Sequence, residues 1–292
     1  MAEPSPALWE GLLDLSRRAI DQFPMWRCEL DNASLSWSGQ GGIVVRGQPS
    51  AGDLEALGLF EPLLGRRWVI AQLGQSLDGR IATATGDSYY INGPETRAHL
   101  HRLRALADAV LIGAGTAIAD RPALTVRHVP GPDPVPIILD PSARVEAIGP
   151  LFDPRHTPRL LILTGRESRR GDWPDHVEVV KLPLVDGQFD PTHIIDCLSL
   201  RGLDRLLVEG GGVTVSRFID AEVLDRLHLL IAPLLIGSGP AGLALAPIER
   251  LAEARRLPMR AYRLADELVV DLDLSCSSTA APGRAPTATT TP

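Results

Sequence analysis

The chain has 292 residues, of which 45% are hydrophobic and 22% are charged, and its formal net charge is −7 at pH 7. This length allows one large domain or two modest ones with an ample core. The negative charge argues against a general nucleic-acid-binding protein. No apolar run approaches the roughly 20 residues that a membrane helix needs. We therefore expect a globular protein with no nucleic-acid or membrane partner.

The cysteines and the first residues bear on the cellular compartment. Cys28, Cys197 and Cys276 are odd in number and far apart in the chain. This pattern fits free thiols in a reducing compartment better than disulfides or a metal site. The first six residues lack the basic segment and apolar core of a secretory signal. We expect a cytoplasmic protein that needs no metal.

Residues 1–64 predict a small appended segment in which the sequence shows no chemistry and whose role stays open. Residues 7–20 carry apolar side chains at helical spacing. Residues 37–46 predict two short strands around a glycine-rich turn. Asp53 is a candidate N-cap for a short helix that follows it.

From residue 67 onward, apolar runs alternate with helical patterns, which is typical of an α/β fold with a largely parallel sheet. The alternation of residues 268–274 indicates an edge or antiparallel strand. Residues 276–292 are mostly Ser, Thr, Ala and Pro and predict a disordered tail. The predicted strands are residues 68–73, 109–112, 135–139, 160–163, 177–181, 205–208, 227–232 and 268–274, and the predicted helices are residues 94–107, 192–200 and 213–219.

One strand-to-helix junction carries the first functional signal. The apolar run 206–208 ends on Glu209, and three glycines then lead into a helical pattern. Glycines let the backbone approach a ligand closely, and a helix N-terminus favours an anion. Ligands of open parallel sheets lie at the carboxyl ends of the strands, where Glu209 is expected. An ordinary turn with a solvated glutamate explains the junction equally well, so both interpretations stay open at this point.

Basic residues on the predicted helix 94–107 give a second signal. Arg97, His101 and Arg104 share one face of that helix, where they could hold a phosphate. For one helix alone, a solvated basic face is the more common explanation. The glycine-rich turn after strand 109–112 contains Gly113 and Gly115, but Ile118 stands at the third glycine position of a dinucleotide fingerprint, so that motif fails.

Several further motifs occur together with these signals, in a fixed order. They comprise Ser76 to Thr83, Gly86 with Ser88, His101 to Arg104, Asp108 to Gly113, Gly115-Thr116, Ala119-Asp120, Pro122 to Thr125, Arg127, Val208 to Gly211, and Ile231 to Gly237. With these motifs, residues 66–240 resemble the RibD C-terminal family, the reductase domain of riboflavin biosynthesis. The resemblance implies a dihydrofolate-reductase-like fold: a mostly parallel central sheet flanked by helices, in a domain spanning residues 65–275.

The resemblance also implies an activity. It is the NADPH-dependent reduction of a 5-amino-6-(5-phosphoribosylamino)pyrimidine, in which hydride delivered to C1 of the sugar converts the ribosylamino group to ribitylamino. Relatives are homodimers, so a homodimer is expected. Positioning and electrostatics suffice for such a hydride transfer, so we expect neither a covalent intermediate nor a metal requirement.

The site residues follow from the same resemblance. Asp78 and Glu209 are expected to be catalytic. Arg104 and Arg127 suit the 5-phosphate, and Arg166, the first of three arginines after strand 160–163, is a candidate for the 2′-phosphate of the cofactor. The expected cofactor contacts are Gly74, Tyr90, Thr116, Asp120, Arg166, Gly210, Gly211, Gly212, Val213 and Thr214, and the expected substrate contacts are Ser88, Arg104, Leu124, Arg127 and Glu209.

The chain departs from the family pattern in places. Arg121 stands where Asp or Asn is usual, Tyr90 replaces a frequent Trp, and Gly212-Val213-Thr214 shifts a hydroxyl by one position. The departures leave open a reductase of the same fold with another pterin-like or aminosugar substrate, or a degenerate nucleotide-binding protein. Residues 1–64 contain no histidine and only Cys28, so they lack the zinc ligands of the deaminase domain that precedes many members of the family.

Overall fold

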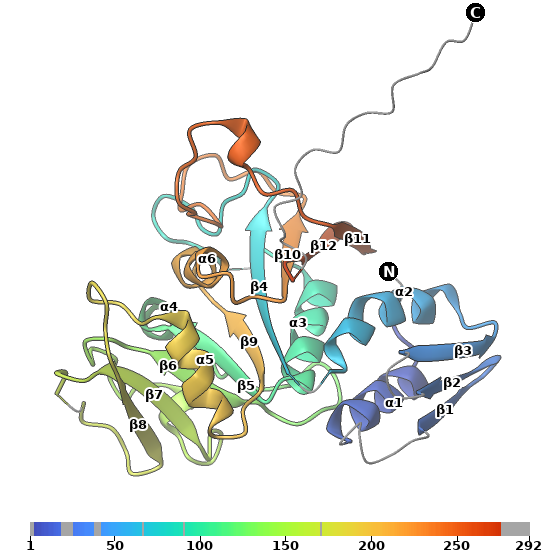
Figure 1. Ribbon diagram of the computed structural model, residues 1–292, viewed down its shortest axis with the longest axis horizontal. Helices are drawn as coiled ribbons and strands as arrows, with labels where there is room; N and C mark the ends of the chain where they lie inside the picture. Colours follow the sequence, from blue (N-terminus) through green and yellow to red (C-terminus); the bar gives the residue numbers. More distant parts are fainter. Residues whose placement is uncertain are drawn as a thin grey trace, which may run out of the picture.

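The structure is a computed structural model that describes residues 3–18, 26–37, 42–65, 67–89, 91–169 and 171–275. It contains a small N-terminal sheet and a large sheet that forms the body of the molecule (Figure 1). The small sheet is antiparallel and consists of β1 (Trp26–Leu30), β2 (Ala33–Trp37) and β3 (Ile43–Gly47), in that order. Helix α1 (Pro6–Arg17) precedes it, and α2 (Ala51–Phe60) follows it.

A serine hydroxyl caps the N-terminus of each of the two N-terminal helices. The Ser5 hydroxyl accepts a hydrogen bond from the backbone N–H of Leu8, and the Ser50 hydroxyl accepts one from the N–H of Asp53. Such caps satisfy N–H groups that have no partner inside the helix. The prediction of Asp53 as the cap is therefore wrong. Asp53 lies in the first turn, and its carboxylate accepts hydrogen bonds from the Ser5 N–H and the Ser50 hydroxyl instead.

The large sheet has nine strands in the order β11-β12-β10-β4-β9-β5-β6-β7-β8. Strands β4 to β10 are mutually parallel, whereas β12 runs antiparallel to both of its neighbours. The strands are β4 (Trp68–Ser76), β5 (Ala109–Gly113), β6 (Val135–Leu139), β7 (Leu160–Gly165), β8 (Val177–Leu182), β9 (Arg205–Glu209), β10 (Arg226–Ala232), β11 (Met259–Leu264) and β12 (Glu267–Asp273).

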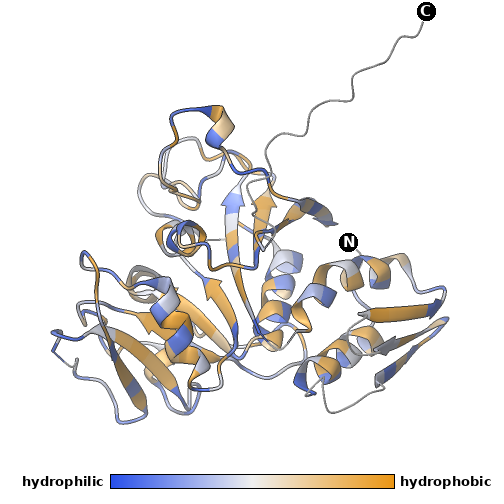
Figure 2. Ribbon diagram, viewed as in Figure 1, coloured by the Kyte–Doolittle hydropathy of each residue, from blue (hydrophilic) through white to orange (hydrophobic). Residues whose placement is uncertain are grey.

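Helices cover both faces of this sheet because its strands are apolar on both faces. On one face, Val69, Ala71 and Leu111 pack with residues of α5 (Pro191–Ser199) and α6 (Gly212–Asp220). On the other face, Ile70 and Ile112 pack with residues of α3 (Pro94–Leu106) and α4 (Ala114–Asp120). Figure 2 shows the strands as mainly hydrophobic, with β4 turning hydrophilic toward its carboxyl end. Three short 3₁₀ turns complete the described elements: Glu61–Leu63, Pro150–Phe152 and Leu251–Glu253.

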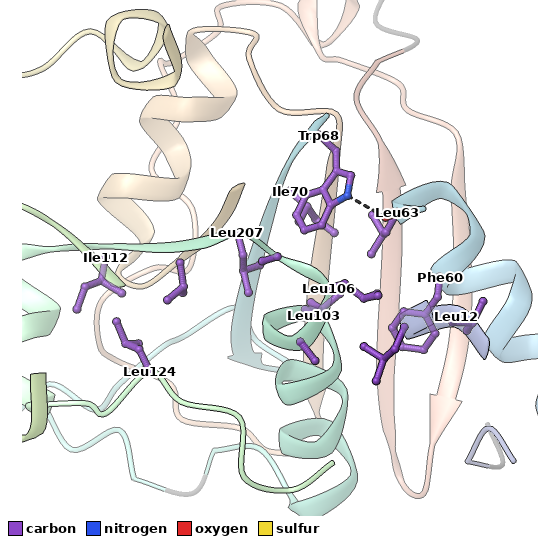
Figure 3. Packing of buried hydrophobic residues seen from close by; sticks show 14 of the residues in the cluster. Leu12, Phe60, Leu63, Trp68, Ile70, Leu103, Leu106, Ile112, Leu124 and Leu207 are labelled. Carbon is purple, nitrogen blue, oxygen red and sulfur yellow. Dashed lines mark hydrogen bonds between the residues drawn. The ribbon is translucent and has the colours of Figure 1, made fainter. Parts of the chain in front are cut away.

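The N-terminal segment shares its core with the large sheet. Leu12 of α1 and Phe60 of α2 lie beside Leu103 and Leu106 of α3 in one buried cluster (Figure 3). At the junction, the indole N–H of Trp68 donates to the carbonyl of Leu63 at 2.8 Å (Figure 3). The segment is therefore packed against the body of the molecule and not merely tethered to it.

The α/β fold with a mostly parallel central sheet, predicted from the sequence, is confirmed. All eight predicted strands of the body occur, as do its three predicted helices. The prediction that residues 268–274 form an edge or antiparallel strand is confirmed in its second alternative, because β12 is antiparallel to β10 and β11, and β11 lies outside it. The sequence missed α4 and β11 in the body and β1 in the N-terminal segment. The predicted glycine-rich turn near residue 40 and the predicted tail 276–292 lie outside the described residues.

Candidate active site

A cavity of about 960 Å³ opens at the carboxyl ends of the parallel strands. Its walls come from the ends of β4, β5, β6 and β9, from one face of α3, and from the first turns of α4 and α6. A parallel sheet places ligands at this edge because the strand ends and helix N-termini meet there. Arg97 and Arg104 line the cavity from α3, Glu209 from β9, and Arg144 from the loop after β6.

Arg104 and Glu209 form a buried ion pair in the cavity wall. Arg104 Nε donates to Glu209 Oε1 and Nη2 donates to Oε2, both at 2.7 Å. Arg104 Nη1 also donates to the Thr125 carbonyl at 3.0 Å. Burial alone would lower the pKa of Arg104, but Glu209 raises it, so the guanidinium stays charged. Two predicted substrate contacts are thus partners of each other, and the bidentate geometry fixes both.

This ion pair lies at one end of a polar row that crosses the sheet. In register, Asp271 of β12 lies beside His228 of β10, which lies beside Gln72 of β4, which lies beside Glu209 of β9. All four side chains are buried under α3. His99 of α3 stacks on His228, with their ring nitrogens 3.0 Å apart. Gln72 and Glu209 belong to the cavity wall, whereas the histidines lie behind it.

Gln72 is the member of the row whose side chain faces the cavity without a partner. It is 7% exposed, and its amide makes no hydrogen bond to any residue within the described part of the chain. The amide atoms of Gln72 are not among the fully buried side-chain atoms that lack a partner, so they stay accessible from the cavity. Its place in the cavity wall therefore marks it as a group that can bind a ligand's polar edge.

Two glycine turns meet at the centre of the cavity, because β5 and β9 are neighbours in the sheet. The Thr116 hydroxyl accepts a hydrogen bond from the N–H of Gly211 at 3.2 Å. A Cβ added at Gly113 would come within 2.8 Å of the Thr214 hydroxyl, and Gly210 has a φ of +128°. The turns therefore need glycine, both for close approach and for backbone conformation. Together they bring the N-terminus of the nine-residue helix α6 to the cavity.

A second close approach lies at the β4 end. A Cβ added at Gly74 would come within 2.1 Å of the Asn92 amide oxygen. Asn92 and Thr96 line the cavity, and both are held from behind by Glu267 of β12. The Glu267 carboxylate also accepts a hydrogen bond from the N–H of Gly93 at 2.9 Å. Glu267 thus fixes the N-terminus of α3 beside the cavity.

The structure places most of the predicted site residues around this one cavity. Leu124 lies in the wall in a left-handed conformation, with φ of +55° and only 2% exposure. Burial raises the pKa of Asp120. The predicted residues that line the cavity are Gly74, Ser88, Arg104, Thr116, Asp120, Leu124, Glu209, Gly210, Gly211, Val213 and Thr214.

Other predicted residues lie elsewhere. Gly212 is a packing position, because a Cβ there would come within 2.1 Å of the Gly242 carbonyl oxygen. Arg166 is exposed, and Arg127 is exposed with its N–H donating to His101 Nδ1 at 2.9 Å. None of these three is among the residues that line the cavity. Tyr90 lies outside the described residues.

Asp78, predicted to be catalytic, lies outside the cavity wall and binds two loops instead. Its carboxylate accepts hydrogen bonds from the Ser76 hydroxyl and from the N–H groups of Ile236 and Gly237. These bonds lower the pKa of Asp78 to about 2. Asp78 is exposed and does not line the cavity. It ties the loop after β4 to the loop after β10, and this second loop reaches the cavity through Pro240.

Sequence reasoning missed several polar residues of the wall. Gln72 could have been noticed as a polar residue inside an otherwise apolar strand pattern. Arg144 follows β6, so the rule that ligands gather at strand ends could have found it too. Asn92, Thr96 and Arg217 carry no such signal, because they reach the cavity only through the packing of α3 and α6.

Two further properties of the described residues accompany the site. No helix within the described residues is both long and apolar enough to cross a membrane. Among those same residues, no group of three or more His, Cys, Asp or Glu side chains is arranged to hold a metal ion.

The comparisons with known proteins bear on this site. The 2,5-diamino-6-ribosylamino-4(3H)-pyrimidinone 5′-phosphate reductase of Methanothermobacter thermautotrophicus is 33% identical over 218 residues, which cover 70% of this chain and 97% of that protein. The riboflavin biosynthesis protein RibD of Aquifex aeolicus is 33% identical over 208 residues, covering 70% of this chain and 57% of that protein. The chain thus spans little more than half the length of the RibD proteins that it matches.

A solved structure agrees with these relatives. The diaminohydroxyphosphoribosylaminopyrimidine deaminase/5-amino-6-(5-phosphoribosylamino)uracil reductase of Thermotoga maritima matches with a TM-score of 0.62 and 27% identity, over 76% of this chain and 62% of that one. The family model for the RibD C-terminal domain matches residues 67–260, which contain the whole cavity wall. The chain therefore belongs to the RibD C-terminal domain family.

Proposed function

We propose that this chain is an NADPH-dependent reductase that converts the ribosylamino group of a 5-amino-6-(5-phosphoribosylamino)pyrimidine to ribitylamino. The observation that carries the proposal is the cavity of about 960 Å³ bounded by the two glycine turns and the Arg104–Glu209 pair. The relative from M. thermautotrophicus, of which the chain covers 97%, supports it through its name as a pyrimidinone 5′-phosphate reductase.

The residues around the glycine turns fit a dinucleotide cofactor. Gly115 has open space where a Cβ would point, and the first turn of α6 presents backbone N–H groups at the cavity. The first N–H groups of a helix have no partner inside the helix, and the helix dipole favours negative charge there. We assign the pyrophosphate to this turn, with Gly210, Gly211, Val213 and Thr214 around it.

The two ends of the cavity differ in chemistry, and this difference supports the orientation of the ligands. Toward β4 and α3 the wall offers Gln72, Asn92 and the Arg104–Glu209 pair, which suit the polar edge of a pyrimidine and the sugar hydroxyls. Toward β6 it offers Ser142 and Arg144. We therefore place the substrate at the α3 end and the adenosine half of the cofactor at the β6 end.

A phosphate on the cofactor's ribose needs a cation at the β6 end. Arg166, the candidate from the sequence, is exposed and does not line the cavity, whereas Arg144 does. A guanidinium binds a phosphate through charge-assisted, bidentate hydrogen bonds. We propose that Arg144, with the hydroxyl of Ser142, takes the role first assigned to Arg166 and gives the preference for NADPH over NADH.

The proposed chemistry requires little of the protein beyond binding and orientation. Opening of the sugar ring gives an imine at C1, and reduction then adds a hydride to C1 and a proton to the nitrogen. NADPH, when bound, supplies the hydride from its nicotinamide ring. Glu209, held by Arg104, has unused lone pairs for the amino groups of the substrate. Arg97 in the wall and Arg127 at the exposed surface nearby are the cations proposed for the 5-phosphate.

The decisive experiment is anaerobic incubation with NADPH and each of two phosphoribosylaminopyrimidines, the aminouracil and the diaminopyrimidinone. We expect one of them to oxidise NADPH, followed at the nicotinamide absorbance band, and to gain two hydrogen atoms by mass spectrometry. Deuterated NADPH should leave its label on C1 of the ribityl chain. Binding of NADPH without turnover of either pyrimidine would favour a reductase of another substrate, and no binding at all would contradict the proposal.

We also propose a homodimer in the cytoplasm. Leu77, Leu234 and Leu235 are 63%, 42% and 73% exposed, and the Leu77 N–H donates to the Leu234 carbonyl at 2.9 Å, so exposed leucines of two loops lie at adjoining backbone positions. An apolar surface of this kind is typical of an interface. Cys28 and Cys197 are free thiols, in keeping with a reducing compartment. Sedimentation equilibrium should give the dimer mass, and Leu235→Glu should shift it toward the monomer.

A further inference from the structure

The strand-free segment 121–134 forms the wall of the cavity beside α3. It contributes Pro122 and Leu124 to the wall, and Leu124 is held there with φ of +55°. Such a conformation costs free energy in a residue with a side chain and persists only where the surroundings enforce it. The hydrogen bonds that hold this segment therefore bear directly on the shape of the site.

Two of these hydrogen bonds come from α3, and a third forms within the segment itself. Arg104 Nη1 donates to the Thr125 carbonyl at 3.0 Å, the Arg127 N–H donates to His101 Nδ1 at 2.9 Å, and the Val126 N–H donates to Asp133 Oδ1 at 2.6 Å. Farther along, Gly131 lies so close to α3 that a Cβ there would come within 2.4 Å of the Ala105 Cβ. The inner side of the segment is thus fixed against α3.

A fourth hydrogen bond comes from the N-terminal segment. The indole N–H of Trp9 in α1 donates to the Pro130 carbonyl at 2.8 Å, across 121 positions of the chain. Trp9 is itself buried, with 4% exposure, and is packed on several sides. Its ring meets Phe60 of α2 edge-on, with centroids 5.6 Å apart, and the Arg102 guanidinium of α3 lies 5.9 Å from its centroid. The donor is therefore held by α1, α2 and α3 together.

We propose that the N-terminal segment is an internal brace, and that Trp9 is a positioning residue which holds the 121–134 segment in the shape that the substrate requires. Trp9 does not line the cavity and acts only through Pro130. The expected effect on the KM for the pyrimidine rests on the proposed function. The expected effect on the structure of the 121–134 segment does not. It gives residues 1–64 a role in the site, although none of the described residues among them belongs to the cavity wall.

The test uses two tryptophan-to-phenylalanine variants of the full chain. Trp9→Phe keeps most of the ring and removes the N–H. Trp26→Phe is the matched control, because Trp26 is also 4% exposed and its indole N–H donates to Asp14 at 3.1 Å, entirely within the N-terminal segment. Each variant loses one part-buried hydrogen bond of an N-terminal tryptophan, but only Trp9→Phe removes a bond to the 121–134 segment.

Two measurements decide the question. Amide hydrogen exchange of residues 121–134 in the ligand-free protein should become faster in Trp9→Phe and stay unchanged in Trp26→Phe. The KM for the pyrimidine should rise about two- to tenfold in Trp9→Phe, as expected for one lost hydrogen bond. The kcat and the NADPH affinity should stay close to those of the wild type. Phe60→Leu, which unseats the indole without removing its N–H, should give a smaller change in the same direction.

The outcomes separate this inference from the proposed function. If the wild type reduces no pyrimidine, the proposed function fails. The exchange experiment still tests whether Trp9 holds the 121–134 segment in place. Unchanged exchange in the 121–134 segment of Trp9→Phe would overturn the brace, whatever the kinetics show. Equal changes in Trp9→Phe and Trp26→Phe would also overturn it, because they would reduce the effect to a general loss of stability.

Discussion

At the scale of single residues, the Arg104–Glu209 pair has the largest predicted effect. Both side chains are less than 10% exposed and share two hydrogen bonds of 2.7 Å. Glu209→Gln removes one charge and leaves Arg104 buried and uncompensated, which should cost about 3–5 kcal/mol in the free energy of unfolding. Urea denaturation would measure this loss. Glu95→Gln, at an exposed position of the same helix as Arg104, should change stability by no more than about 0.5 kcal/mol.

Arg144 and Arg166 offer a second comparison of single residues. Arg144 lines the cavity and Arg166 does not, so Arg144→Ala should weaken NADPH binding while leaving NADH binding nearly unchanged. One charge-assisted hydrogen bond of about 1.5–3 kcal/mol corresponds to roughly a ten- to hundredfold loss of affinity. Isothermal titration with both cofactors measures the ratio. A loss of preference in Arg166→Ala, with Arg144→Ala unaffected, would return the role to the residue first chosen from the sequence.

At the scale of elements, the N-terminus of α3 depends on a carboxylate from β12. Glu267 is 6% exposed and accepts hydrogen bonds from the Gly93 N–H and the Thr96 hydroxyl. Glu267→Gln removes the negative charge that favours this helix end, and it should lower the free energy of unfolding by about 0.5–2 kcal/mol. Thermal and urea unfolding of the variant would show this. The neighbouring exposed residue gives the control: Asp266→Asn should have almost no effect.

The elements also show how far the sequence could predict the structure. Long apolar runs predicted the central strands, because a parallel strand is buried on both faces. The strand β11 was not predicted, because its exposed positions include the arginines Arg260 and Arg263, which interrupt an apolar strand pattern. The helix α4 was not predicted, because its seven residues include a glycine and are too few to show helical periodicity.

The site was predicted less completely than the fold, because it depends on tertiary contacts between residues that are far apart in the sequence. The motifs located the glycine turns and Glu209, since strand ends and glycines leave local signals. They did not show that Arg104 and Glu209, 105 positions apart, bind each other. Nor did they show the row from Asp271 to Glu209, which exists only through the register of four strands from distant parts of the chain.

At the scale of the whole molecule, buried histidines make stability depend on pH. Burial, followed by the charges of Arg104, His128 and Arg127, lowers the pKa of His101 to about 3. Burial, followed by His228 and Arg102, lowers the pKa of His99 well below its usual value, while Asp271 opposes this shift. In the unfolded chain a histidine has a pKa of about 6.5. Below that pH the unfolded chain therefore binds protons that the folded chain does not, and stability falls as the pH falls.

The range from pH 7.5 to 5 isolates this effect of the histidines. Burial alone would raise the pKa of Asp271, but the adjacent His228 and the hydrogen bonds from Arg226 lower it to about 2. An aspartate with a lowered pKa loses its stabilising effect only below its unfolded pKa of about 3.9. Carboxylates of this kind therefore contribute little between pH 7.5 and 5, where the histidines are already destabilising the fold.

We predict that His101→Gln makes the protein less sensitive to pH. A glutamine amide oxygen can still accept the Arg127 N–H, but it binds no proton. Each buried histidine contributes at most about 1.4 kcal/mol per pH unit below its unfolded pKa, so the variant should lose about 1–2 kcal/mol less than the wild type between pH 7.5 and 5. Urea unfolding at the two pH values measures this difference. His193→Gln, at an exposed position of α5, should keep the wild-type dependence. If His101→Gln also kept it, His101 would have to be protonated in the folded protein at pH 5, and the solvent would have to reach its ring despite the 3% exposure of the residue.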